Sequence, residues 1–391
     1  MRYNFDKVID RSGTSAEKVE GLKHIWGRTD LIPLWVADMD FATAPFVTDA
    51  IRKRCENEVL GYTGKPDSYY NAIINWVKQR YDLVVAKEMI NFVPGIVPGI
   101  GMAMNCFTQK GDKVMIQPPV YHPFAWVTTR NERTLVINPL KWENGMYRMD
   151  LDAFREQIKG CKLFILCNPH NPGGVVWTEA ELRAIADICY DEKVLVFSDE
   201  IHADLTLPPH THRPFATVSE KARMNSVTFM SPSKAFNMPG LSASHALIFN
   251  EDLRKRFRIY MDAGELDMGH VFAFLSVEAA YSHGTEWLDQ CLAYIQGNID
   301  FVDDFLKNHA PKIKAIRPEA SYLVWLDCRE LKLSQKDLNE FFVDKAHLAL
   351  NDGEMFGKEG IGFMRLNVAS PRCIIEKAMK QLADAYQLYI K

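Results

Sequence analysis

Short apolar runs rich in β-branched residues recur between residues 90 and 250, and several of the stretches between them have helical periodicity. Such runs are typical of strands buried on both faces of a sheet. The best-marked helix follows Thr178, which forms a capping box with Glu181. The predicted strands cover residues 113–117, 134–137, 162–168, 194–199, 226–230 and 245–249. Strands that alternate with helices predict a mostly parallel sheet covered on both faces.

The pattern changes after about residue 285. Longer helical stretches are predicted at 288–309 and 334–349, and an alternating segment at 362–368 predicts a late strand. The predicted fold class is therefore α/β, with a large domain built on a mostly parallel sheet of the seven-stranded type. We assign residues 46–285 to this domain, and residues 1–45 and 286–391 to a smaller α+β domain.

Composition narrows the range of partners. The 391 residues include 46 Lys plus Arg and 50 Asp plus Glu, which gives a formal net charge of −4. This balance argues against nucleic acid or an anionic membrane as a partner and favours small molecules. The eight cysteines are scattered without a CxxC pair, and they are interpreted as reduced core residues. Residues 1–13 are charged and polar where a signal peptide needs an apolar stretch, and the apolar run at 92–107 is interrupted by proline and glycine, so neither secretion nor a membrane span is expected and a cytoplasmic protein is predicted.

Polar residues follow four of the predicted strands. They are Tyr121, Asn171, Asp199 and Lys234. Because the carboxyl ends of parallel strands meet at one edge of a sheet, an aromatic ring, an amide, a carboxylate and an amine are expected in one crevice. Each residue also has a structural explanation: a core aromatic, a turn residue before proline, a helix cap or metal ligand, and a surface lysine, respectively.

Together these residues match the needs of pyridoxal phosphate. This cofactor requires a lysine for its aldehyde, a carboxylate for its ring nitrogen, a hydrogen-bond donor for its phenolic oxygen, an aromatic ring for its face and an anion site for its phosphate. The free amides at the start of a helix can bind the phosphate, although the same glycine-rich segment also fits a tight turn without a ligand. Hydroxyl groups after the fifth predicted strand can add to this site. The predicted phosphate ligands are Gly95, Ile96, Val97, Ser231 and Ser233.

The order and content of these motifs resemble the class I/II aminotransferase superfamily of fold type I. The general motifs are Asn-Pro-His-Asn-Pro at 168–172, Ser-Asp-Glu-Ile-His at 198–202 and Ser-x-Ser-Lys-x-Phe at 231–236. Within that superfamily the sequence is most similar to the MalY/PatB branch of C–S lyases, the cystathionine β-lyases. The branch is marked by Pro-Leu-Trp-Val-Ala-Asp-Met-Asp-Phe at 33–41, Gly-Tyr-Thr-Gly at 61–64 and the segment 232–240.

The resemblance implies a role for each strand-end residue. Lys234 binds the cofactor aldehyde and acts as the catalytic base, Asp199 pairs with the ring nitrogen, and Asn171 bonds the phenolic oxygen and contacts substrate. Tyr121 stacks on the ring and is a second catalytic residue. His202 stands where tyrosine is common, so the phenolic oxygen is expected to be bonded less strongly.

Three further residues take their roles from the resemblance. Arg365 matches the arginine that binds the substrate α-carboxylate, and Ala37 lies where relatives contact that carboxylate through the backbone. Tyr62 is expected to reach the cofactor phosphate of a neighbouring subunit, which implies a homodimer with shared active sites. Ser242 replaces a common phosphate-binding arginine, so amides and hydroxyls must bind more of the phosphate.

The activity implied by the resemblance is β-elimination from L-cystathionine, with release of homocysteine, pyruvate and ammonia in methionine biosynthesis. Cysteine desulfhydrase activity is also expected. Protonation of the departing sulfur is assigned to Lys234 or Tyr121, with His122 as a neighbour of less importance. Transamination of an α-amino acid is the nearest rival, because it begins with the same proton transfer.

Other function classes have less support. The Ser231 to Lys234 spacing fits the S-x-x-K pattern of serine acylases, but Ser-Asp-Asn and Lys-Thr-Gly are missing. Neither GxGxxG nor GxxxxGK[ST] occurs. His210 and His212 are interpreted as parts of a surface loop, and no metal site is predicted. A regulatory role through surface binding remains an alternative that could coexist with catalysis.

Overall fold

The structure is a computed structural model that describes residues 2–389. The α-helices are α1 (Glu17–Trp26), α2 (Pro45–Cys55), α3 (Asp67–Tyr81), α4 (Ile96–Phe107), α5 (Pro123–Arg130), α6 (Leu151–Gln157), α7 (Glu179–Asp191), α8 (Glu220–Met224), α9 (Glu251–Ala263), α10 (Val271–His283), α11 (Thr285–His309), α12 (Gln335–Glu340) and α13 (Arg372–Tyr389). The strands are β1 (Ile32–Pro33), β2 (Ile90–Val93), β3 (Lys113–Ile116), β4 (Thr134–Ile137), β5 (Lys141–Glu143), β6 (Met146–Arg148), β7 (Cys161–Cys167), β8 (Leu195–Asp199), β9 (Ser226–Met230), β10 (Ser244–Leu247), β11 (Lys314–Ile316), β12 (Leu323–Asp327), β13 (Leu348–Ala349), β14 (Asn351–Asp352) and β15 (Phe363–Asn367).

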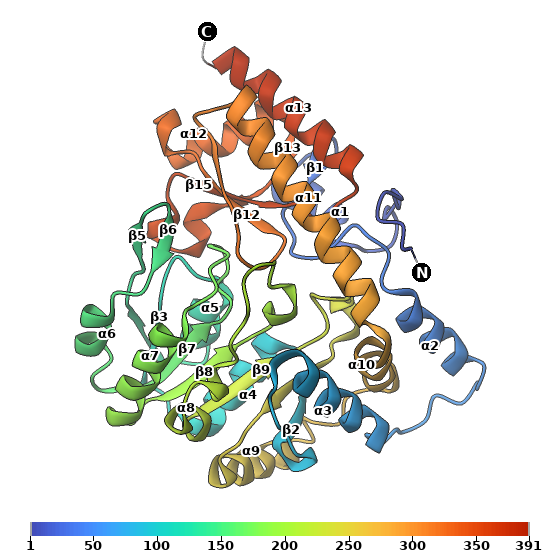
Figure 1. Ribbon diagram of the computed structural model, residues 1–391, viewed down its shortest axis with the longest axis vertical. Helices are drawn as coiled ribbons and strands as arrows, with labels where there is room; N and C mark the ends of the chain where they lie inside the picture. The colour runs from blue at the N-terminus through green and yellow to red at the C-terminus, as the bar shows by residue number, and fades with distance from the viewer. Residues whose placement is uncertain (1, 390–391) are drawn as a thin grey trace.

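A seven-stranded sheet lies in the lower half of the molecule in Figure 1, in the order β2-β10-β9-β8-β7-β3-β4. Neighbouring strands from β9 to β4 are parallel, and β10 runs antiparallel to β2 and β9. The predicted α/β class with a mostly parallel sheet is therefore confirmed. The sequence did not predict β2, because its four residues join directly to the glycine-rich segment before α4.

Both faces of this sheet are buried. Along β7, Phe164 packs into a core with α7 residues such as Leu182, whereas Ile165 points to the opposite core with Ile100 of α4. Because alternate residues of the strand meet different helix layers, the whole strand must be apolar. The capping box predicted at the start of α7 is present, and it fixes the residue at which that helix begins.

A smaller antiparallel sheet, β11-β12-β15-β14, lies beside the long helix α11, and α11 packs along α13 (Figure 1). The single helix predicted at 334–349 is wrong. Helix α12 ends at Glu340, and the chain then forms one π-helical turn at Phe341–Lys345. It enters β13 at Leu348, and this strand pairs with β1. Strand pairing thus overrides helical periodicity at this end. The division at residues 46 and 285 stays a prediction.

Three smaller predictions can be compared with the structure. All eight cysteines are unpaired, but Cys55 and Cys373 are exposed, so the assignment of all eight to the core is wrong for these two. His212 is buried, and its Nε2 lies 2.8 Å from Glu200 Oε2, so only His210 fits the predicted surface loop. Between residues 2 and 389, every helix is too short or too polar to cross a bilayer.

Candidate active site

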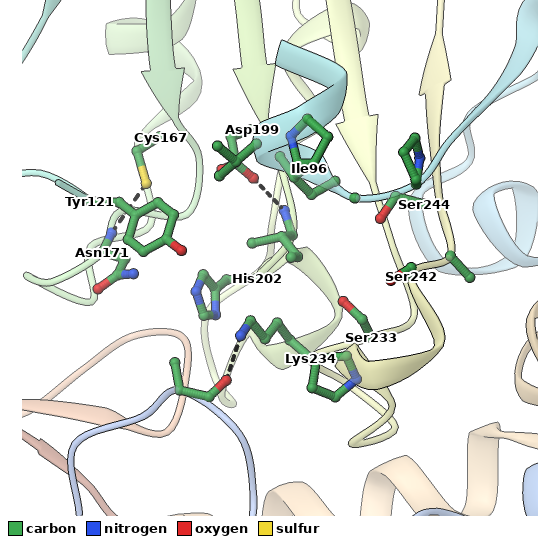
Figure 2. Close-up of a pocket in the computed structure, with 18 residues that line it drawn as sticks. Ile96, Tyr121, Cys167, Asn171, Asp199, His202, Ser233, Lys234, Ser242 and Ser244 are labelled. Atoms are coloured by element: carbon green, nitrogen blue, oxygen red, sulfur yellow. Dashed lines mark hydrogen bonds between the residues drawn. The ribbon is translucent and has the colours of Figure 1, made fainter. Parts of the chain in front are cut away.

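A cavity of about 200 Å³ lies at the carboxyl ends of the parallel strands. Figure 2 shows Tyr121, Asn171, Asp199 and Lys234 around it, so the structure brings together the four strand-end residues that the sequence singled out. The complete lining is Ala37, Pro94, Gly95, Ile96, Val97, Pro98, Tyr121, Cys167, Asn171, Asp199, Ile201, His202, Ser233, Lys234, Pro239, Ser242, Ala243 and Ser244.

Lys234 follows β9 and extends its amine across the cavity. Its Nζ donates a hydrogen bond to the carbonyl oxygen of Ala37 (Figure 2). Burial lowers the pKa of Lys234 to about 8; Arg365 adds to this effect, whereas Asp38 and Asp199 oppose it. A substantial fraction of the amine is therefore neutral near pH 8, in the form that can act as a nucleophile or a base.

Asp199 ends β8 and is buried at the far side of the cavity. Its Oδ1 accepts a hydrogen bond of 3.1 Å from the Ile201 N–H, and within residues 2–389 no ion pair reaches this carboxylate. Burial raises the pKa of Asp199 to about 7, and the neighbouring Glu200 adds to the shift. A carboxylate in this situation is stabilised by a cationic ligand.

The N-terminus of α4 closes another side of the cavity through Gly95, Ile96 and Val97. Amides of the first helical turn have no partners within the helix, and with the helix dipole they favour an anion. Pro98 lacks an N–H, which leaves the preceding amides to provide this site.

Three serines from the loop between β9 and β10 and from the start of β10 line the same cavity, namely Ser233, Ser242 and Ser244. Ser231, the other hydroxyl that the sequence suggested, is absent from the lining. Its Oγ donates to the Ala243 carbonyl at 2.7 Å and accepts from the Ser233 N–H at 3.1 Å. Ser231 therefore shapes the loop that presents Ser233.

Arg365 lies on β15 and is buried beside Asn171. Its Nη1 donates to Asn171 Oδ1 at 3.1 Å, and its Nη2 donates to Asn351 Oδ1 at 2.5 Å and to the Trp35 carbonyl at 3.1 Å. The guanidinium also lies over the Phe356 ring, 4.8 Å from its centroid. All of these partners are neutral, and burial lowers the pKa of Arg365 to about 10. A substrate carboxylate would supply the missing negative charge.

Two aromatic residues complete the wall. Tyr121 lies at the loop after β3, and burial raises the pKa of its phenol, so it stays protonated. His202 is buried with Nδ1 unpartnered among the described residues, and burial, with Lys234 and Arg365, lowers its pKa to about 3. His202 is therefore neutral at ordinary pH.

Among the predicted site residues, Ser231, Arg365 and Tyr62 are absent from the cavity lining, and Tyr62 does not contact a lining residue through any hydrogen bond described between residues 2 and 389. Its side chain is 99% exposed, on a stretch between α2 and α3 without helix or strand. The predicted contact with a second subunit stays a prediction.

Sequence reasoning missed Tyr322, Asn351 and Ser244. Tyr322 is buried and donates its hydroxyl to the Ala37 carbonyl at 2.9 Å, the same oxygen that Lys234 contacts. Asn351 lies opposite Arg365 in the pairing of β14 with β15. The strand pairing that places Asn351 joins segments 14 residues apart through an irregular turn, and no local pattern indicated it.

The side chains of the cavity fit pyridoxal phosphate. A buried amine is available for the aldehyde, and an unpaired carboxylate suits the protonated ring nitrogen. Helix-terminal amides and hydroxyls suit the phosphate, while Tyr121 provides a ring face.

Comparisons with known proteins point to the same cofactor. The family model "Aminotransferase class I and II" matches residues 29–382. Cystathionine beta-lyase PatB of Bacillus subtilis (strain 168) is 38% identical over 384 residues, which cover 98% of this chain and 99% of PatB. The crystal structure of cystalysin from Treponema denticola, which contains pyridoxal 5'-phosphate, has a TM-score of 0.96 and 34% identity and covers 100% of both chains. The PLP-bound C–S lyase from Staphylococcus hominis has a TM-score of 0.91 and 36% identity, with coverage of 99% of this chain and 98% of that one.

The likeness extends over the whole chain, and the cavity presents the groups that the cofactor needs. Pyridoxal 5'-phosphate is therefore the cofactor of this protein. The chain belongs to the class I and II aminotransferase family of fold type I, in the group that contains PatB and cystalysin.

Proposed function

We propose that this protein catalyses β-elimination from sulfur amino acids, with L-cystathionine as substrate and homocysteine, pyruvate and ammonia as products. The placement of Lys234 and Asp199 in one cavity, with Arg365 hydrogen-bonded to the lining residue Asn171, supports the proposal most directly. Full-length likeness to a cystathionine β-lyase and to a C–S lyase favours elimination over transamination. Cysteine is proposed as a second substrate, and methionine biosynthesis in the cytoplasm as the setting.

The bound cofactor supplies an aldehyde that condenses with amines and an electron-poor ring that accepts negative charge from the substrate Cα. Asp199 holds the ring nitrogen protonated, because a cation beside this buried carboxylate removes the cost of its unpaired charge. Asn171 and His202 line the adjacent wall, where the phenolic oxygen is expected. Ser233 and the amides at 95–97 hold the phosphate.

The chain's own residues then orient the substrate and move its protons. Arg365 binds the α-carboxylate through two N–H groups, with the Ala37 backbone alongside. Lys234, neutral in substantial part because burial lowers its pKa to about 8, removes the Cα proton. The departing sulfur receives a proton from Lys234 or from Tyr121, whose raised pKa keeps its phenol protonated.

We also propose that the protein acts as a homodimer in which Tyr62 reaches the phosphate of the second subunit's cofactor. The almost complete exposure of Tyr62 and the partial exposure of Val59 and Leu60 nearby support this assignment. Such apolar side chains are buried when a partner covers them.

Incubation of the cofactor-loaded protein with L-cystathionine, without any keto acid, tests the proposed function. Pyruvate and a free thiol are expected in equal amounts over many turnovers. A parallel reaction with a keto acid measures transamination. Amino-group transfer to that acid without pyruvate release from cystathionine would contradict the proposal and favour the aminotransferase alternative.

A further inference from the structure

The segment at residues 35–40 runs past the cavity and is held through its backbone. The Ala37 carbonyl accepts the hydrogen bond from Lys234 (Figure 2). The Asn367 Nδ2 donates to the carbonyls on both sides, Val36 at 2.7 Å and Asp38 at 2.6 Å. These hydrogen bonds fix the position of the Ala37 carbonyl relative to the Lys234 amine.

The side chains of the same segment enter a compact cluster of four charges, which we name the four-charge cluster: Arg11, Lys18, Asp38 and Asp40. Arg11 Nη2 lies 2.6 Å from Asp38 Oδ2, and Arg11 Nη1 lies 3.2 Å from Asp40 Oδ1. Lys18 Nζ lies 2.9 Å from Asp40 Oδ2 and 3.5 Å from Asp38 Oδ1. Two cations thus contact the same two anions, and the cluster has no net formal charge.

Lys18 is the most deeply buried residue of the four-charge cluster. Its side chain has 0% relative exposure, although it carries a charge. Its Nζ also donates to the Asp38 carbonyl at 3.3 Å. A lysine buried to this extent needs anionic and hydrogen-bonding partners, because loss of its hydration costs several kcal/mol. The segment that carries Ala37 is therefore fastened to α1 by a desolvated ion pair.

The cluster acts electrostatically on the catalytic amine. Among the charges that shift the pKa of Lys234, Asp38 has the largest effect, ahead of Arg365 and Asp199. Burial, and after it Asp38, raises the pKa of Tyr322, which shares the Ala37 carbonyl with Lys234. The charged and titratable groups that face Lys234 are Asp38 from the 35–40 segment, Arg365 from β15, Asp199 and His202 from the end of β8, Tyr121 from the loop after β3, and Tyr322 from the approach to β12.

We propose that Arg11 and Lys18 are positioning residues for Lys234. Through their ion pairs with Asp38 and Asp40 they keep the Ala37 carbonyl in contact with the lysine amine. The same ion pairs set the net charge near that amine. This inference rests on the proposed function, in which Lys234 binds the cofactor and moves the substrate proton. Neither residue lines the cavity.

A pair of variants with opposite charge changes tests the proposal. Arg11→Gln leaves the cluster with a net charge of −1, which favours the cationic form at Lys234 and raises its pKa. Asp40→Asn leaves a net charge of +1 and lowers it. A shift of roughly 0.5 pKa unit in each direction is expected for one charge at this range in a partly desolvated site. A purely structural role would make both variants shift in the same direction.

Two readouts report the shift. The visible absorbance of the cofactor bound at Lys234 is titrated against pH in the loaded protein. In cofactor-free protein, the rate at which acetic anhydride labels Lys234 is followed against pH by peptide mass spectrometry, which measures the amine itself. The wild-type midpoint for labelling is expected near pH 8.

Control variants separate the cluster from general charge effects. Arg28→Gln and Asp30→Asn make the same chemical changes in another ion pair, 2.7 Å long and away from the cavity, and no shift is expected. Arg11→Lys keeps the charge and should titrate like the wild type. The Arg11 side chain is 23% exposed, so its variants are expected to fold. If Asp40→Asn fails to fold, the Arg11→Gln and Arg11→Lys pair decides alone.

Absence of a shift in Arg11→Gln, or shifts of the same sign in Arg11→Gln and Asp40→Asn, would overturn the proposal while cofactor binding and pyruvate release in the wild type remain. Failure of the wild type to bind pyridoxal phosphate or release pyruvate would instead contradict the proposed function.

Discussion

Two groups of charged residues lie next to the 35–40 segment, one at the cavity and one in the four-charge cluster. They differ in whether other residues of the protein neutralise their charges. In and beside the cavity, Asp199, Lys234 and Arg365 form no ion pairs with one another or with other residues between 2 and 389, and each pKa is shifted toward the neutral form. In the four-charge cluster every carboxylate contacts both cations, and Asp38 raises the pKa of Arg11. Ion pairs within the protein neutralise the charges of the four-charge cluster. The charges at the cavity have no such partners among the described residues, so bound ligands are expected to neutralise them.

This difference separates residues that bind ligands from residues that support them. A buried charge without a counter-ion costs free energy in the free protein, and a ligand of opposite charge recovers that cost on binding. In the proposed function, the cofactor ring nitrogen and the substrate carboxylate are the ions that Asp199 and Arg365 lack.

The largest expected effect comes from removal of the catalytic amine. Lys234→Ala should lower the rate of pyruvate release from L-cystathionine by on the order of 10³-fold or more, because both the cofactor attachment and the base are lost. The measurement is a pyruvate assay at saturating cofactor. Lys221→Ala, on the surface of α8, serves as the control and should keep its activity. Undiminished elimination by Lys234→Ala would show that this amine is neither the cofactor attachment nor the base.

The unpaired charge of Asp199 can be measured as a stability effect. Because its pKa is raised to about 7 in the folded protein, from about 3.9 unfolded, its stabilising contribution is complete below pH 4 and is lost as the pH rises through 7. Relative to wild type, cofactor-free Asp199→Asn should therefore gain roughly 2 to 3 kcal/mol in free energy of unfolding between pH 5 and pH 8.

Urea unfolding of both cofactor-free proteins at the two pH values gives this difference. Saturation with pyridoxal phosphate should reverse its sign at pH 8, since the ring nitrogen then pairs with the carboxylate. A difference that does not change with pH would show that the carboxylate is already compensated in the free protein.

The smallest of the expected effects comes from supplying Arg365 with a carboxylate of its own. Asn351→Asp replaces the amide oxygen that accepts from Arg365 Nη2 at 2.5 Å with a charged one. The new ion pair competes with the substrate carboxylate, so KM for L-cystathionine should rise about tenfold, which corresponds to about 1.4 kcal/mol, while kcat changes little.

Steady-state kinetics test this expectation, with Asn308→Asp at an exposed position of α11 as the control for the same chemical change. A fall in kcat with unchanged KM would assign Asn351 to the proton transfers instead.

The sequence predicted the sheet half of the site better than the other half. Tyr121, Asn171, Asp199 and Lys234 each follow an apolar run, and parallel strands bring such positions together by their geometry alone. Ser244 was missed because its strand, β10, is antiparallel and delivers its first residue to the cavity.

The remaining half depends on contacts that no local pattern indicates. Asn351 reaches Arg365 through pairing of two short strands, and Tyr322 reaches Ala37 across 285 residues. The helix predicted at 334–349 fails at its end because residues 348–349 form a strand. This strand pairs with β1, which lies more than 300 residues earlier in the chain. Tertiary contacts of this kind override local propensity.

The central claim is that Lys234 holds pyridoxal phosphate covalently. Borohydride reduction of the loaded protein, followed by peptide mass mapping, tests it most directly. One pyridoxyl-phosphate adduct per chain is expected, on the peptide that contains Lys234. An adduct on another lysine, or no adduct in protein that holds the cofactor, would contradict it.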